Sequence, residues 1–366
     1  MKPSSGILIS LAALFVVAAE AVTSPRLSVG LNLYGNTAES TASHARIVGT
    51  EVEARFEDQL SPHFHLKVAG GMQIEAGATQ ARWAEEFRPR NVQRLRQATL
   101  TWQPDALFKI VVGAADQDKL ASPLLLQRQA FPAIQEAFDI PLGPWRLEIF
   151  GQQAVANDTS SLQPWASGAQ GLPAFYLERI GITWKPSETF SWNAYGSHFA
   201  FQHLGGPNVF ASQFMGNSIE GTDATNAVYR YHFQGLEAGT VITARWGRFS
   251  PELRASVLRN TAAPRGRSEG WRLAASVDYQ ANEHFRLLPS LELFRMESDA
   301  APAFYNERVF GHNNRNGFGL RVSALWPKDG LELQGRWVHS GVIDAHPFQS
   351  DLDWVQVQFS AQYDVL

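Results

Sequence analysis

Three pairs of side chains in the 366-residue chain have residue types that could support chemistry: His339 with Ser340, His63 with His65, and Asp344 with His346. In the first pair, the imidazole could activate the hydroxyl as a nucleophile if the two groups lie within hydrogen-bond reach. The second pair could bind a metal ion through ring nitrogens, and the third has the residue types of an Asp–His pair in a protease. Each role requires both side chains on one face, so the local secondary structure decides whether a pair can perform it.

Charged side chains are far more frequent than these pairs, and they follow a regular spacing. Between residues 48 and 57, Val48, Val52 and Phe56 have one parity, whereas Glu51 and Arg55 have the other. Successive side chains of a β-strand point to opposite faces, so this period of two gives one apolar and one polar face. A helix would instead scatter the apolar residues around its axis.

The same period extends along almost the whole chain and predicts an all-β protein. We expect sixteen strands, over residues 27–35, 48–58, 64–76, 93–102, 107–116, 133–142, 145–154, 175–184, 190–201, 234–248, 253–259, 271–280, 285–296, 317–326, 331–341 and 353–364. The sixth and tenth strands have the weakest pattern, and fourteen or eighteen strands also fit the sequence. An even number allows an antiparallel up-and-down barrel to close.

The strand assignment argues against a catalytic or metal-binding role for these three pairs. His339 and Ser340 are adjacent in a strand, so their side chains point to opposite faces. His63 and His65 share a face but have no further histidine nearby, and Asp344 and His346 stand alone in a loop. We therefore expect no catalytic residues, no metal site and no cofactor.

The segments between the strands alternate between short and long. The short ones are rich in Pro, Asp and Gly, which terminate strands and form turns, at 61–63, 103–105, 185–188, 250–252, 282–284 and 327–330. The long ones lie at 36–47, 78–92, 155–173, 202–227, 260–270, 297–316 and 343–351. Successive hairpins with two unlike ends are typical of outer-membrane barrels, which have short periplasmic turns and longer extracellular loops.

Composition agrees with a membrane barrel and excludes other classes. The mean hydropathy is −0.20 because polar and apolar faces cancel, and no apolar run after the first twenty residues approaches the length of a transmembrane helix. The chain has no Cys, and its net charge of −4 gives no reason to expect a nucleic-acid partner. Many of the aromatic residues flank the short turns, where a barrel carries an interfacial girdle.

The first 21 residues resemble a secretory signal. Lys2 precedes the apolar stretch 6–18, and Ala19 and Ala21 provide the small residues of a cleavage site. We expect cleavage after Ala21, which leaves residues 22–366 as a single transmembrane barrel in the outer membrane.

The chain as a whole resembles a Gram-negative outer-membrane porin. Residues 95–102, 107–113 and 120–131 are similar to a hairpin of phosphate- and polyphosphate-selective porins and of alginate-export barrels. By the pattern of these families, the third outer loop, 116–132, folds into the lumen and narrows it. Its apolar run Pro123 to Leu126 is compatible with packing against the inner wall, although an exposed loop also fits. The resemblance would imply several lysines here, and their scarcity gives no support for phosphate selectivity.

If the apolar face meets lipid, the charged face lines a water-filled lumen of mixed charge. The residues expected there or at the constriction are Asp116, Asp118, Lys119, Arg128, Lys67, Lys109, Arg55, Arg146, Arg179, Arg245, Arg272, Arg321, Arg336, Glu51, Glu53, Glu75 and Glu148. The charges could equally pair across strands as structural ladders. A further basic cluster, which includes Arg94 and Arg96, is assigned to the second outer loop as a solvated surface.

The sequence therefore predicts a porin, a channel for passive diffusion of small hydrophilic solutes or ions. Its expected partners are outer-membrane lipid, lipopolysaccharide and the barrel assembly machinery, and a homotrimer is compatible with the sequence. Two alternatives stay open: a non-conducting barrel whose loops bind a surface partner, and a channel for an anionic polysaccharide.

Overall fold

The computed structural model describes residues 25–41, 43–81, 88–117, 120–127, 129–156 and 172–365. The expected signal peptide, residues 1–21, lies outside this part of the chain. Within it, no helix is both long and apolar enough to span a membrane.

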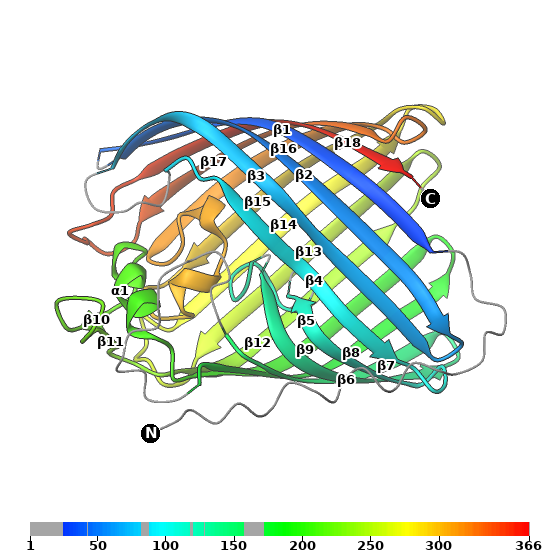
Figure 1. The fold of residues 1–366 in the computed structure, drawn as a ribbon, viewed down its shortest axis with the longest axis horizontal. Helices are drawn as coiled ribbons and strands as arrows, with labels where there is room; N and C mark the ends of the chain where they lie inside the picture. The colour runs from blue at the N-terminus through cyan, green and yellow to red at the C-terminus, as the bar shows by residue number, and fades with distance from the viewer. Residues whose placement is uncertain are drawn as a thin grey trace, which may run out of the picture.

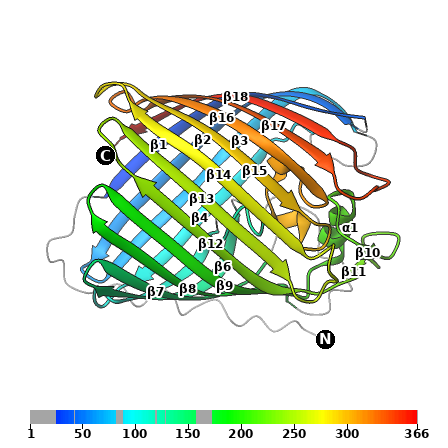
Figure 2. The same cartoon turned by 180° about the vertical axis from the view of Figure 1, so that it is seen from behind.

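Sixteen antiparallel strands form one closed barrel (Figures 1 and 2). They are β1 (Arg26–Ser40), β2 (Ser43–Ser61), β3 (Phe64–Ala81), β4 (Val92–Trp102), β5 (Phe108–Asp116), β6 (Ala130–Leu142), β7 (Trp145–Ala154), β8 (Ala174–Ser187), β9 (Phe190–Gln202), β12 (Phe233–Ala244), β13 (Phe249–Asn260), β14 (Glu269–Gln280), β15 (Arg286–Met296), β16 (Arg315–Trp326), β17 (Leu331–Val342) and β18 (Leu352–Asp364). Each strand pairs with its neighbours in sequence, and β1 pairs with β18 from Ser28↔Asp364 to Ser40↔Leu352. The predicted sixteen-strand barrel is confirmed.

The alternation read from the sequence corresponds to the two faces of the wall. In β18, Val355 and Val357 are 42% and 55% exposed on the outer face, whereas Trp354 is 5% exposed and points inward. An outer face of exposed Val, Leu, Ile and Phe around a polar interior is the pattern of a barrel that sits in lipid. The fold is therefore a transmembrane β-barrel.

Three separators differ from prediction, and one of them is the turn expected at 185–188, most of which lies inside β8. The first long loop, expected at 36–47, is nearly absent because β1 and β2 continue as a paired ladder to Ser40 and Ser43. The turn expected at Ser250–Glu252 is wrong as well, since Pro251 lies inside β13. The chain turns instead at Gly247, whose φ of 59° is a left-handed conformation that glycine adopts without strain.

Aromatic residues gather at the short-turn end, as the sequence predicts. Trp145 stacks on Trp184 with ring centroids 5.3 Å apart, and Phe249 stacks on Tyr279 at 4.9 Å. These rings lie on neighbouring strands on the outer face, where aromatic side chains suit the membrane interface.

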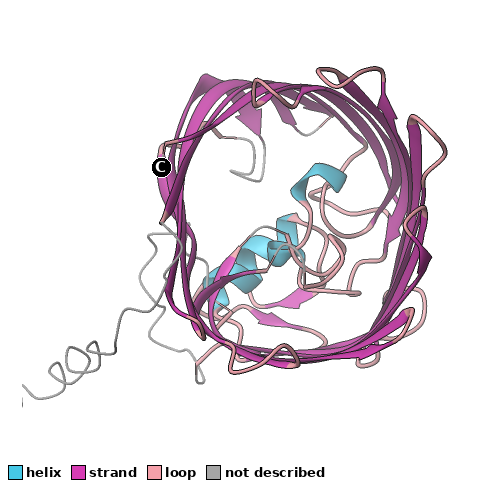
Figure 3. Cartoon of the chain, turned by 90° about the vertical axis from the view of Figure 1, so that its right-hand side faces the viewer, coloured by secondary structure: helices cyan, strands magenta, loops and turns pink. Residues whose placement is uncertain are grey.

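Several long loops fold into the barrel at the opposite end. The loop between β9 and β12 holds helix α1 (Gly206–Phe214) and a small sheet of β10 (Ile219–Glu220) and β11 (Val228–Tyr229), and the loop between β15 and β16 holds the 3-10 helices η1 (Ala303–Tyr305) and η2 (Arg308–Phe310). Viewed along the barrel, short helices and loops lie within the ring of strands (Figure 3). The molecule's buried apolar core is therefore the contact between these loops and the inner wall.

Candidate functional site

The barrel interior contains a cavity of about 1730 Å³. It extends from loop residues Ser122, Pro123 and Phe310 to the β16–β17 turn at residues 327–330. Most of the side chains that β1, β2, β17 and β18 contribute to its lining are polar or charged, so the space suits water and hydrophilic solutes.

One wall of the cavity carries an excess of positive charge. Glu292 of β15 accepts from Arg272 Nη2 at 2.8 Å and from Arg336 Nη2 at 2.7 Å. Arg321 of β16 also lines the cavity and donates to Ser290 Oγ at 3.3 Å. Two guanidinium groups therefore share the Glu292 carboxylate, while Arg321 and the carboxylate of Glu332 line the cavity beside them; we call Arg272, Arg321, Arg336 and Glu292 the arginine wall.

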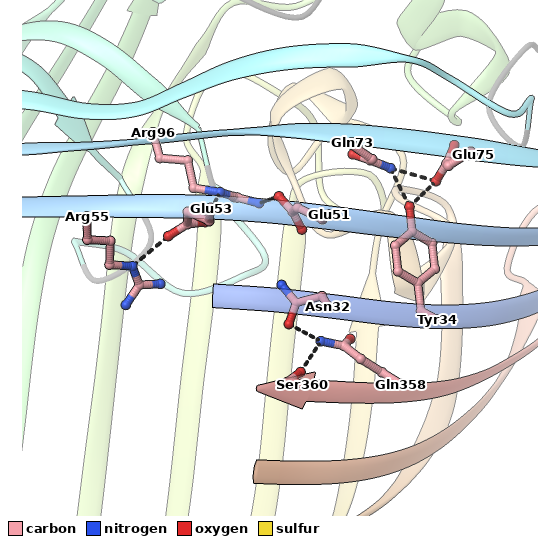
Figure 4. Close-up of polar contacts among 10 residues, drawn as sticks. All are labelled: Asn32, Tyr34, Glu51, Glu53, Arg55, Gln73, Glu75, Arg96, Gln358 and Ser360. Atoms are coloured by element: carbon pink, nitrogen blue, oxygen red, sulfur yellow. Dashed lines mark hydrogen bonds and ion pairs between the residues drawn. The ribbon is translucent and has the colours of Figure 1, made fainter. Parts of the chain in front are cut away.

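The wall formed by β2 and β4 is balanced in charge (Figure 4). Arg96 pairs with both Glu51 and Glu53, and its Nε lies 2.7 Å from Glu53 Oε2. Arg55 Nε lies 2.6 Å from the other oxygen of Glu53. Two guanidinium groups and two carboxylates thus neutralise one another.

A polar network of Tyr34, Gln73 and Glu75 continues this wall toward the long loops (Figure 4). Tyr34 donates to Glu75 Oε1 at 2.6 Å, and Gln73 Nε2 donates to both groups at the same distance. Glu75 Oε2 also accepts from the backbone N–H of Arg90 at 2.9 Å. Glu75 therefore connects β3 to the β3–β4 loop.

The ceiling of the cavity is built from two loops, of which the sequence pointed to one. The β5–β6 loop folds inward as expected, with Leu124, Leu125 and Leu126 at most 2% exposed. The backbone N–H of Ser122 in this loop donates to Glu237 on β12 at 2.8 Å.

The second loop, between β15 and β16, was expected only as a long polar loop. Its Tyr305 is fully buried, stacks on Phe201 at 5.6 Å and meets Phe131 edge-on at 5.6 Å. The backbone joins the two loops directly, since Gln127 N–H donates to Tyr305 O at 2.7 Å and Glu307 N–H donates to Pro123 O at 3.0 Å. Its apolar residues, such as Ala300, Ala301 and Phe310, are the sequence signal that could have identified it.

Two titratable groups in the outer loops are affected by this packing. Burial raises the pKa of Tyr229 well above its usual range, and its hydroxyl shares a 2.7 Å hydrogen bond with Ser212 of α1. Burial, together with the Arg315 guanidinium, lowers the pKa of His346.

The structure brings seven of the predicted site residues together around the cavity: Glu51, Glu53, Arg55, Arg179, Arg272, Arg321 and Arg336. Seven other predicted residues do not line this cavity: Asp116, Lys67, Lys109, Arg146, Arg245, Glu75 and Glu148. The remaining three, Asp118, Lys119 and Arg128, lie outside the described residues, so their part in a constriction stays a prediction.

Several of the outlying residues form local pairs. Lys67 Nζ lies 3.1 Å from Glu57, and Arg146 Nη2 lies 2.6 Å from Asp139. Arg245 follows the end of β12 and is exposed, because the chain turns earlier than predicted.

Arg96 is a cavity residue that the sequence analysis placed on the second outer loop. The register between β3 and β4 shifts here, with Ala69 opposite Gln97 and Gly70 opposite Leu95. Arg96 is the extra residue of this bulge, which breaks the parity from which faces are read.

His339 and Ser340 lie on opposite sides of the barrel wall, as the strand assignment predicts. His339 Nδ1 lies 3.0 Å from Asp353 Oδ1 on the outer face, whereas Ser340 is fully buried on the inner side. No cluster of three or more His, Cys, Asp or Glu side chains suited to a metal occurs in the described part of the chain.

Closed strands, an apolar exterior, a polar cavity and inward loops together define a transmembrane β-barrel with a hydrophilic interior. The chain is similar to OccK7 (OpdD) of Pseudomonas aeruginosa, with a TM-score of 0.50 and 11% identity over 93% of this chain and 99% of that one. It is also similar to a loop L8 deletion mutant of OmpT, an outer membrane protein of Vibrio cholerae, with a TM-score of 0.51 and 8% identity over 93% and 99%. The chain thus shares its closed-barrel fold with these two structures.

No protein-family model matches the chain, and no curated protein matches it significantly.

Proposed function

We propose that the protein is a passive channel of the outer membrane for small hydrophilic solutes, with a preference for anions. The observation that carries this proposal is the polar cavity of about 1730 Å³ inside a barrel whose outer face is apolar. A wall of mixed charge supports a hydrated pathway rather than a tight binding site.

The anion preference rests on the arginine wall. Arg272 and Arg336 share the carboxylate of Glu292, and Arg321 donates a hydrogen bond to the hydroxyl of Ser290. The opposite wall around Arg96 is neutral by pairing, so the arginine wall is a local positive region in a cavity whose lining otherwise contains both signs of charge. A field of one sign inside a low-dielectric wall raises the local concentration of counter-ions.

Planar bilayer recordings test this function. The purified barrel is expected to give steady ohmic steps, with a reversal potential in a KCl gradient that favours chloride. Arg321→Glu should move that potential toward the potassium side, because it converts the excess charge of the wall. Arg245→Glu is the matched control, since Arg245 is exposed at the end of β12 and should leave the potential unchanged.

Absence of any conductance would overturn the channel proposal and favour a barrel whose loops bind a surface partner. If an acidic polysaccharide blocks the current and neutral sugars do not, the result would instead support a channel for an anionic polysaccharide.

A further inference from the structure

The β17–β18 loop, residues 343–351, contains Asp344 and His346, and it is attached to the neighbouring loops in two separate ways. The first attachment uses the backbone of Asp344, whose N–H donates to Asn314 Oδ1 at 3.0 Å and whose carbonyl accepts from Asn314 Nδ2 at 2.8 Å. Asn314 Nδ2 also donates to Gln349 Oε1 at 3.1 Å. Amide side chains and backbone groups do not titrate, so this attachment does not depend on pH.

The second attachment is an aromatic contact with helix α1. The ring of Phe348 meets that of Phe214, the last residue of α1, with ring centroids 5.0 Å apart and planes inclined by 64°. The imidazole of His346 lies beside the same Phe348 ring, with centroids 5.7 Å apart. Both segments lie at the end of the barrel opposite the short turns (Figures 1 and 2). The contact therefore joins the β17–β18 loop to the β9–β12 loop at the outer opening.

His346 holds the backbone of Phe348 in place for this contact. Its Nδ1 accepts a hydrogen bond from the Phe348 backbone N–H at 3.3 Å. A ring nitrogen accepts only while it carries no proton, and both ring nitrogens of a protonated histidine are donors. Protonation would therefore turn this hydrogen bond into two opposed N–H groups, and the backbone of Phe348 would lose the partner that positions its ring.

The surroundings of the imidazole favour its neutral form. The charged groups that face it are Arg315 of β16 and Asp299 of the β15–β16 loop, and α1 contributes no acidic or basic side chain. The carboxylate of Asp299 already accepts hydrogen bonds from Ser218 and Ser298. Burial and the Arg315 guanidinium lower the pKa of His346 below its ordinary value, although Asp299 acts in the opposite direction.

We propose that His346 is a pH-sensitive latch, whose protonation releases Phe348 from Phe214 and frees the β17–β18 loop from α1 at the outer opening of the barrel. The docked loop favours the neutral imidazole, so the contact is complete above the ordinary pKa of histidine and weakens as the pH falls below it. The attachment through Asn314 persists, so the loop moves about that point and does not unfold. As regulation of the channel this inference rests on the proposed function, whereas the latch itself does not require conduction.

Hydrogen exchange of the full chain in detergent micelles tests the latch at pH 7.5 and pH 5.0. Protection is expressed relative to an unstructured chain at the same pH, so that the chemical pH dependence of exchange cancels. Protection of the Phe348 amide should fall roughly 3- to 10-fold at pH 5.0, the effect of losing one hydrogen bond. The amides of Ile343 and Asp344, which donate to Asn314, should keep their protection. Equal protection of Phe348 at both pH values, or an equal loss in both segments, overturns the proposal.

Substitutions at position 346 separate the proton from the hydrogen bond. His346→Asn supplies an oxygen that accepts from the N–H two residues on, as in an Asx turn, and does not titrate, so protection should be the same at both pH values. His346→Lys carries a permanent charge and no acceptor, so protection should be low at both. His232→Asn is the matched control, because His232 is exposed in another outer loop, and it should keep the pH response of the parent. A pH response that survives His346→Asn, or parental protection in His346→Lys, overturns the latch.

Bilayer recordings at the same two pH values show whether the latch regulates the channel. The parent should give noisier single-channel current at pH 5.0 than at pH 7.5, and His346→Asn should give the same noise at both. A released loop with unaltered current overturns the regulatory role. A barrel that is silent at both pH values but loses protection overturns only the channel function, and a conducting barrel with pH-independent protection overturns only the latch.

Discussion

Single residues connect the barrel wall to the loops that fill it. Glu237 is 2% exposed on β12, and its carboxylate accepts from the Ser122 N–H at 2.8 Å and from the Ser197 hydroxyl at 3.4 Å. A buried backbone N–H without an acceptor costs about 1–3 kcal/mol. Glu237 therefore fixes the start of the β5–β6 loop to the barrel wall, together with Arg179, which donates to Leu120 O at 3.3 Å.

Replacing this acceptor should loosen the loop. We expect Glu237→Ala to reduce hydrogen-exchange protection of the Ser122 amide roughly 5- to 150-fold, which corresponds to the loss of about 1–3 kcal/mol. Glu237→Gln keeps a carbonyl oxygen as the acceptor and should retain most of the protection. Equal protection in the two variants would show that the loop is held by other contacts.

At the scale of the elements, the β5–β6 and β15–β16 loops fill part of the barrel interior, and we call these two loops the plug. The β5–β6 and β15–β16 loops bury their apolar residues against each other and against the inner faces of β6, β8 and β9. Tyr305 lies at the centre of this packing and also donates to Ala156 O at 3.2 Å. Aromatic side chains in such positions contribute several kilocalories per mole.

Removal of the Tyr305 ring should therefore release the plug. Tyr305→Ala is expected to cost about 3–5 kcal/mol of loop packing and to raise the single-channel conductance and its noise. Tyr305→Phe preserves the stacking on Phe201 and should keep conductance near that of the parent. A Tyr305→Ala channel with unchanged conductance would mean that the plug does not limit the pathway.

At the scale of the molecule, stability depends on which face of the wall meets lipid. The outward Val357 and the inward Gln358 are adjacent in β18, and Gln358 lines the cavity. Although the two residues are adjacent in sequence, one faces outward and the other faces the cavity, because successive strand residues point to opposite sides.

This difference predicts unequal responses to the same charge. Val357→Arg should destabilise folding into lipid vesicles by about 2–4 kcal/mol, the cost of a basic residue near the middle of the lipid-facing surface. Gln358→Arg places the guanidinium in the aqueous cavity and should cost much less. Urea titration of vesicle-reconstituted protein measures both, and similar losses would contradict the assignment of faces.

The sequence by itself determined the barrel, because strand parity is a local property of the backbone. Val355 and Gln356 had to face opposite sides in any strand, and Pro, Gly and Asp marked most of the turns. The same rule correctly removed His339 and Ser340 as a catalytic pair. It failed at Arg96, where a bulge changes the parity, and at the β12–β13 turn, where Gly247 rather than Pro251 reverses the chain.

Only the tertiary structure decided how the interior is filled and which charges meet. Glu292 pairs with Arg272 and Arg336, which lie 20 and 44 residues away, and Tyr305 packs on Phe131 and Phe201 across still longer separations. Such contacts depend on closure of the barrel and on the path of the loops, which no short sequence pattern encodes. Closure therefore turned a regular alternation of polar residues into one wall with excess arginine and another that is neutral.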